Sequence, residues 1–122
     1  MKSCLVVDDS SVIRKVARRI LEGMHFEITE AEDGEQALGA CRRQLPDAIL
    51  LDWNMPKMDG FELLSVCRMK WPGIPVVVFS AEQNDLAHEA VERGAFAWVR
   101  KGNEFTLLLE FLDYAIHQSV HA

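Results

Sequence analysis

Residues 48–51 are an uninterrupted apolar run, Ala-Ile-Leu-Leu, and one carboxylate, Asp52, follows them directly. Pro46 and Pro56 flank this run, which is typical of a short strand buried on both faces. Such strands belong to parallel sheets that are covered by helices. In an open parallel sheet, ligands bind just outside the carboxyl ends of the strands. We therefore expect the chemistry of this chain at Asp52.

Strand-like runs alternate with helical patterns along the rest of the chain. The strands are predicted at 4–7, 27–31, 48–52, 76–79 and 95–100, and the helices at about 11–24, 34–44, 60–71, 84–93 and 103–118. Ser10 or Ser11 and Asp33 stand where helix N-caps are expected. Five strands alternating with five helices predict an α/β fold, a doubly wound parallel sheet with right-handed crossovers. Because no linker or repeat interrupts the 122 residues, we expect a single domain over 1–122.

Chemically active side chains follow four of the predicted strands, at one edge of the expected sheet. They are Asp8 and Asp9, Asp52, Ser80 and Lys101. Two carboxylates about 4 Å apart repel by about 4 kcal/mol at an effective dielectric constant of about 20. A bound cation, a shifted pKa or the Lys101 ammonium would offset this repulsion. With only oxygen ligands on offer, Mg²⁺ is the natural cation, and Ca²⁺ or Mn²⁺ are weaker candidates.

This set of groups suits transfer of a phosphoryl group to Asp52. The carboxylate attacks phosphorus while Mg²⁺, Ser80 and Lys101 neutralise and orient the phosphoryl oxygens. The product is an aspartyl phosphate. Each acid alone is also explained as a solvated loop or cap residue, and Asp33 and Asp59 are read in that way. The ordered combination of acids, hydroxyl and lysine favours a functional site at Asp8, Asp9 and Asp52.

Over its whole length the chain resembles the receiver domains of two-component response regulators, most closely the single-domain chemotaxis type. The residues that carry the resemblance are Val-Val-Asp-Asp-Ser at 6–10, Leu-Asp-Trp-Asn-Met-Pro at 51–56, Met-Asp-Gly at 58–60, Phe-Ser-Ala-Glu at 79–82 and Lys101. The resemblance implies a flavodoxin-like (βα)5 fold with strand order 2-1-3-4-5. It also implies a signalling module, not an enzyme, that catalyses its own phosphorylation and dephosphorylation.

The resemblance assigns a role to each site residue. Asp52 would be the phosphoacceptor, and the donor would be a histidine kinase or a histidine phosphotransfer protein. Mg²⁺ would be held by Asp8, Asp9, Asp52 and the backbone carbonyl of Asn54. Ser80 and Lys101 would contact the phosphoryl group.

The family's conformational switch couples the phosphoryl group to an aromatic side chain on the fifth strand. Ser80 would move towards the phosphate and let the aromatic residue turn inward. Trp98, three residues before Lys101, takes that place here, where the family usually has Tyr or Phe. Gly102 follows Lys101, where the family typically has proline in a cis peptide bond. A non-proline cis bond costs about 2.5–4 kcal/mol, so we expect a trans bond and a different aim for Lys101.

The last predicted helix has two apolar stripes. Its core face is expected to be Phe105, Leu108, Leu109, Leu112 and Ile116. A second stripe, Leu107, Phe111 and Tyr114, lies nearly opposite and is typical of a contact surface. A downstream target protein or a homodimer partner would bind there, although scattered surface hydrophobes are the simpler interpretation.

The first predicted helix combines an apolar face with a basic one. Its apolar face is expected to contain Val12, Ile13, Val16, Ala17, Ile20, Leu21 and Met24. The basic residues Arg14, Lys15, Arg18 and Arg19 are expected on the solvated side. Since this helix borders the acids, the basic side is also a candidate docking surface for the phosphoryl donor. A site for an anionic nucleotide is a third, weaker interpretation.

Composition excludes some classes of function and favours a cytoplasmic location. A net charge of −6 argues against binding nucleic acid through its phosphates. No apolar run approaches the roughly 20 residues that cross a bilayer. Cys4, Cys41 and Cys67 lie in predicted strands and helices and are expected to be reduced core residues.

Two other functions stay open. One is a phosphorylation-independent scaffold or dimer module with the receiver fold, which Trp98 and Gly102 keep possible. The other is a Mg²⁺-dependent phosphatase of the haloacid dehalogenase type. Those enzymes place a second acid two residues after the nucleophile, where this chain has Asn54.

Overall fold

The computed structural model describes residues 2–52, 60–80 and 91–100, and the side chains at 60, 61, 79, 80 and 97–100 lie outside that description. Its elements are β1 (Lys2–Val7), α1 (Ser11–Gly23), β2 (Phe26–Ala31), α2 (Gly34–Arg43), β3 (Ala48–Asp52), α3 (Gly60–Lys70), β4 (Val76–Ser80) and β5 (Ala97–Arg100). Residues 91 and 92 are also helical. Residue 93 lies in a turn, and residues 84–90 of the predicted helix 84–93 and all of 103–118 lie outside the described residues.

The strands form one parallel sheet in the order β2-β1-β3-β4-β5. This confirms the predicted fold class and strand order. β1 starts two residues earlier than predicted, because Lys2 pairs with Phe26 at the start of β2. β5 is shorter than predicted and starts at Ala97.

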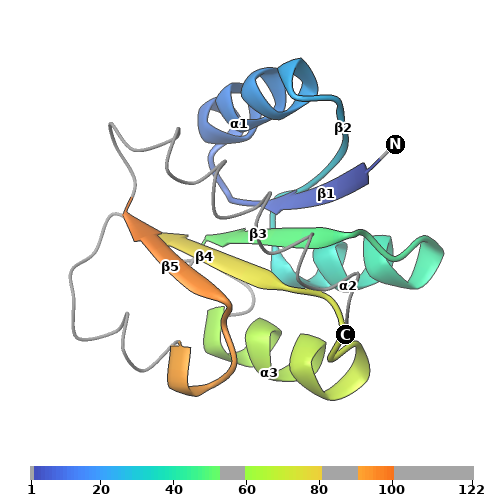
Figure 1. Ribbon diagram of the computed structural model, residues 1–122, viewed down its shortest axis with the longest axis vertical. Helices are drawn as coiled ribbons and strands as arrows, with labels where there is room; N and C mark the ends of the chain where they lie inside the picture. The colour runs from blue at the N-terminus through green and yellow to red at the C-terminus, as the bar shows by residue number, and fades with distance from the viewer. Residues whose placement is uncertain (1, 53–59, 81–90, 101–122) are drawn as a thin grey trace.

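Helices cover both faces of the sheet, with α1 above it and α2 and α3 below it in Figure 1. Side chains alternate between the two faces along each central strand. Leu50 packs with Ala17 and Leu21 of α1, whereas Leu51 packs with Leu63 and other residues of α2 and α3. All of β3 is buried, as the apolar run predicts. At the sheet edge, β2 alternates buried and exposed residues over most of its length.

The helix caps follow the sequence closely. The Ser10 hydroxyl accepts a hydrogen bond from the Ile13 amide at 3.3 Å and caps α1. The Asp33 carboxylate accepts one from the Gln36 amide at 2.9 Å and caps α2. The Gln36 side chain bonds back to the amide of Glu32, one residue before the cap, at 3.0 Å.

The apolar face predicted for α1 is partly wrong. Ala17 and Leu21 are buried, but Val12 is 67% exposed and Val16 is 39% exposed. Val12 precedes Ala17 by five residues, so their side chains point about 140° apart around the helix. The helix is turned so that Arg14, not Val12, lies beside the Ala17 and Leu21 stripe.

The cationic residues of α1 separate into two groups. Arg14 and Arg18 both bind Glu30 on β2. The Arg14 side chain is only 14% exposed, so the prediction of a solvated position is wrong for it, whereas the Arg18 side chain is 37% exposed. Lys15 and Arg19 are exposed, as predicted. In the described part of the chain, no helix has the length and apolar character that a bilayer crossing requires.

Candidate functional site

Strand register brings the first and third strands' acids to the same level. Val7 on β1 pairs with Leu51 on β3, and Asp8 and Asp52 are the next residues of the two chain segments. The chain continues from β1 to β2 on one side and places β3 on the other side of β1. The carboxyl ends of β1 and β3 therefore flank the point where the strand order reverses, which is where open α/β sheets bind their ligands.

Asp8, Asp9 and Asp52 form a carboxylate cluster. Each contributes one carboxylate oxygen, and the three oxygens lie within 4.8 Å of one another. Asp8 and Asp52 are buried, with 0% and 2% of their surface exposed, whereas Asp9 is exposed. The cluster is thus open to solvent through Asp9 and closed towards the core.

The backbone of Asp8 is fixed by neighbours on both sides. Its amide donates to the Ala31 carbonyl at 3.0 Å, and its carbonyl accepts from Nη1 of Arg14 at 2.6 Å. One oxygen of its carboxylate accepts from the Ser10 amide at 2.8 Å. This leaves little freedom in the turn that leads from β1 to α1.

The cluster fits a hard divalent cation. All three donors are carboxylate oxygens, and at this spacing their negative charges repel one another. Mg²⁺ favours one or two carboxylates and keeps several positions for water or phosphate oxygens. Asp8, Asp9 and Asp52 would hold such an ion, with the exposed side at Asp9 left for its other ligands.

The family model of the response regulator receiver domain matches residues 4–113. The chain belongs to this family.

Relatives of this receiver domain include long and short proteins. The DNA-binding transcriptional regulator NtrC of Klebsiella pneumoniae is 36% identical over 112 residues, which are 91% of this chain and 24% of NtrC. The chemotaxis protein CheY of Listeria monocytogenes is 33% identical over 117 residues, which are 94% of this chain and 98% of CheY. This receiver domain thus spans about a quarter of the NtrC relatives' length but nearly all of CheY.

Solved structures agree with the fold. The beryllofluoride-activated NtrC4 receiver domain dimer has a TM-score of 0.91 and 26% sequence identity, covering 98% of this chain and 99% of that one. The resemblance to receivers and the role of the chain as a response regulator receiver in two-component signalling are confirmed.

The other predicted site residues of the receiver are placed only in part. Asp52 pairs with Phe79, so the backbone of Ser80 lies one residue further along β4, at the same edge of the sheet. The backbone of Trp98 lies in β5 opposite Val78. The side chains of Ser80 and Trp98 lie outside the described part of the chain. So do all of Asn54, Lys101, Gly102 and the predicted contact residues Leu107, Phe111 and Tyr114.

Sequence patterns do not reveal the role of Glu30 beside this cluster. Burial opposes its ionisation, but hydrogen bonds from Arg18 and Arg14 outweigh it and hold the pKa of the Glu30 carboxyl below its usual range. The hydrogen bond to Glu30 also raises the pKa of Arg18. The four-residue spacing of the two arginines puts both on one side of α1, which is the one signal that the sequence carries.

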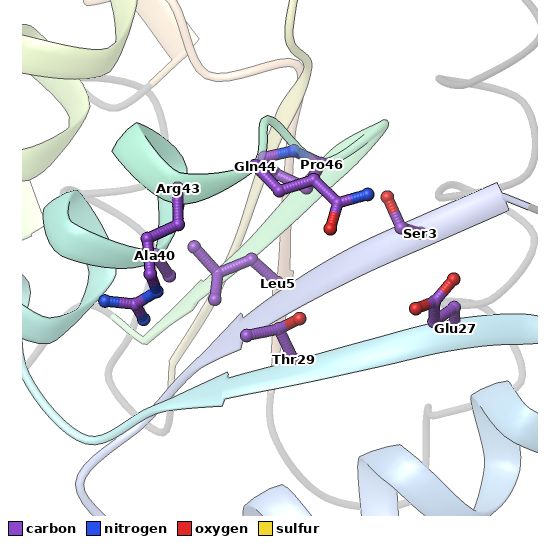
Figure 2. A pocket seen from close by; sticks show the side chains of 8 residues that line it. All are labelled: Ser3, Leu5, Glu27, Thr29, Ala40, Arg43, Gln44 and Pro46. Atoms are coloured by element: carbon purple, nitrogen blue, oxygen red, sulfur yellow. The ribbon is translucent and has the colours of Figure 1, made fainter.

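A second concave region of the receiver lies away from the acids. It is a hollow of about 280 Å³ near the amino ends of β1 and β2. Figure 2 shows Arg43 of α2 and Glu27 of β2 at opposite ends of the hollow, with Leu5 and Thr29 between them. Glu27 and Arg43 are exposed, and the hollow lacks the convergence of buried charge that marks Asp8 and Asp52. The carboxylate cluster is the better candidate site.

Proposed function

We propose that this receiver accepts a phosphoryl group on Asp52 from a phosphohistidine, with Mg²⁺ held by Asp8, Asp9 and Asp52. The donor is a histidine kinase or a histidine phosphotransfer protein. The observation that carries the proposal is the convergence of three carboxylate oxygens within 4.8 Å at the carboxyl edge of the sheet. Receiver domains typically bind Mg²⁺ in an acidic pocket, and this cluster has the oxygen donors for it.

The proposed transfer is a displacement at phosphorus. A carboxylate oxygen of Asp52 forms a bond to phosphorus while the phosphorus–nitrogen bond of the donor breaks, and the imidazole nitrogen keeps the electron pair. Mg²⁺, when bound, offsets the negative charge of the phosphoryl oxygens. Asp8 and Asp9 would hold the ion with the Asn54 carbonyl as a further ligand, and Ser80 and Lys101 would contact the phosphoryl group. Water later attacks phosphorus, which releases phosphate and restores the carboxylate.

The burial of Asp52 is compatible with this role. Burial removes competing hydrogen bonds from water and holds the carboxylate at one end of β3. The exposed carboxylate of Asp9 marks the side from which a phosphodonor reaches the cluster. Proximity and orientation of this kind account for much of the rate when little covalent chemistry is required of the protein.

The proposed output is a change in a protein-binding surface. Receiver domains interact with kinases and effector domains, and the related NtrC4 receiver forms a dimer. Ser80 and Trp98 act as the switch, and Leu107, Phe111 and Tyr114 form the surface for a target protein or a second copy of the chain. We further propose that residues 1–122 act as one domain in the cytoplasm and do not bind nucleic acid.

The exposed side of α1 is the proposed contact for the phosphoryl donor. Val12 and Val16 are exposed one turn apart, and Lys15 and Arg19 are exposed on the same helix. α1 starts two residues after Asp9, so a helix bundle that binds it lies beside the carboxylate cluster.

Labelling with radioactive acetyl phosphate tests the proposal. With Mg²⁺, the wild-type chain should take up label that is stable in acid, and chelation of the metal should prevent it. Asp52→Asn should remove the label, whereas the control Asp47→Asn, a change to an exposed acid just before the amino end of β3, should keep it.

Two outcomes would contradict the proposal. Steady multiple turnover of a small phosphate ester would indicate a phosphatase. Absence of label from a folded wild-type chain would indicate a phosphorylation-independent scaffold.

A further inference from the structure

Arg14 links the carboxylate cluster to the end of β2. Its Nη1 donates to the carbonyl oxygen of Asp8 at 2.6 Å, and its Nε donates to Oε1 of Glu30 at 3.0 Å. The guanidinium is planar and rigid, so these two contacts together fix its orientation. Arg14 is therefore not a free surface cation.

Glu30 is the second part of this link. Its other carboxylate oxygen, Oε2, accepts from Nε of Arg18 at 2.7 Å. Arg14 and Arg18, both of α1, therefore hold the Glu30 carboxylate at once. Arg18 also donates to Glu22 at 3.2 Å. Charge-assisted hydrogen bonds of this kind are about twice as strong as neutral ones.

Both ends of the Asp8 backbone are thereby tied to β2. The amide of Asp8 donates to Ala31, and the carbonyl of Asp8 is held by Arg14, which is held by Glu30, the residue before Ala31. The carbonyl of Asp8 belongs to the peptide unit that leads to Asp9. Because that unit is planar, holding its oxygen sets the direction in which the chain places Asp9.

We propose that Arg14 is a positioning residue for the divalent cation, with Glu30 as its anchor. By holding the peptide between Asp8 and Asp9, Arg14 aims the exposed carboxylate of Asp9 at the two buried ones. Without this contact the Asp9 carboxylate would turn into solvent, where its charge is better hydrated and further from the negative charges of Asp8 and Asp52. This inference rests on the proposed cation site but concerns residues that do not touch the ion.

The test compares two conservative variants. Arg14→Lys keeps the positive charge, but one ammonium cannot reproduce the fork that spans Asp8 and Glu30. The matched control is Arg18→Lys, which removes the same kind of guanidinium from the same carboxylate of Glu30 without touching Asp8. The measurement is the dissociation constant of Mg²⁺ alone, by titration calorimetry, with no phosphodonor present.

Arg14→Lys should weaken Mg²⁺ binding about tenfold, which is the usual effect of changing a residue that orients a metal ligand. Arg18→Lys should change Mg²⁺ binding by less than about twofold, because Arg18 does not contact Asp8. Thermal unfolding in a chelator measures the structural effect of each change separately. If Mg²⁺ affinity fell in proportion to stability in both variants, Arg14 would have a structural role only, and the inference would be wrong.

Glu30→Gln is a second route if Arg14→Lys does not fold. It keeps the shape of the anchor and removes its charge, so Mg²⁺ binding should weaken. Because Glu30 also binds Arg18 of α1, thermal unfolding in a chelator again measures the structural effect separately. An unchanged Mg²⁺ affinity in Arg14→Lys or Glu30→Gln would overturn the inference while leaving the cation site intact. A wild-type chain that binds no Mg²⁺ would overturn the cation site and this inference together.

Discussion

Val7 of β1 pairs with Leu51 of β3, and Asp8 and Asp52 follow them at the same level of the sheet. Val7 and Leu51 also lie in the same buried cluster. A shift of one residue in this pairing would move every side chain of β3 to the opposite face. The meeting of the two carboxylates is therefore a consequence of core packing, and changes in the core test how firmly it is held.

Leu50→Ala should lower the free energy of unfolding by about 2–5 kcal/mol, because the side chain is fully buried and its removal leaves a cavity. Leu45 is the matched control, since it is the same residue type but 48% exposed. Leu45→Ala should cost less than about 1 kcal/mol. Urea unfolding of the three proteins checks this, and equal losses at the two positions would contradict the packing described for β3.

Asp33→Ala should destabilise the protein by about 1 kcal/mol, because it removes the acceptor for the Gln36 amide at the start of α2. Asp33→Asn keeps a side-chain oxygen at the same place and should cost only a fraction of that. Thermal unfolding of both variants gives the comparison. Similar losses would show that the charge of Asp33, rather than its cap, is what matters.

The three cysteines should be unreactive in the folded protein. They are buried free thiols, and burial raises the pKa of Cys4 and of Cys67 to about 12 and the pKa of Cys41 above its usual range. The thiolate is the reactive form, so a thiol reagent at about pH 8 should modify none of them until denaturant is added. Rapid modification of any one in the native protein would contradict its burial.

Glu30 should make stability depend on pH in the acidic range. Its pKa is lowered in the folded chain from an ordinary 4.5, so its contribution is complete above that value and is lost as pH falls through the lower folded value. The stability difference between the wild type and Glu30→Gln should be largest near pH 6 and shrink towards about pH 3. Urea unfolding at both pH values measures it, and a difference that grows in acid would contradict the ion pairs with Arg14 and Arg18.

The strands and the acidic cluster were predictable because they depend on local patterns, whereas the strand order was implied by the resemblance to receiver domains. The apolar run before Asp52 is long enough to mark a buried strand, and the alternation of strands and helices fixes which strand ends share an edge. The proximity of Asp8 and Asp52 therefore follows from the order of the elements along the chain. Ser10 and Asp33 were found as caps because cap chemistry involves only the next few residues.

The orientation of α1 was not predictable from its periodicity. Val12, Val16, Ala17 and Leu21 are all apolar, and together they span too wide an arc to define one face. The rotation of α1 about its axis is set by its contacts with β2, because Glu30 binds Arg14 and Arg18 and holds that side of the helix against the strand. Pairing of distant charges is a tertiary property, which a single sequence does not display.

The most direct test of the central proposal is to identify the residue that carries the phosphoryl group. Borohydride reduces an aspartyl phosphate to homoserine, and peptide mass spectrometry then locates the change. After incubation with acetyl phosphate and Mg²⁺, we predict homoserine at position 52 and an unchanged Asp8 and Asp9. Homoserine at either of those two acids, or none in a chain that binds Mg²⁺, would contradict the assignment of Asp52 as the phosphoacceptor.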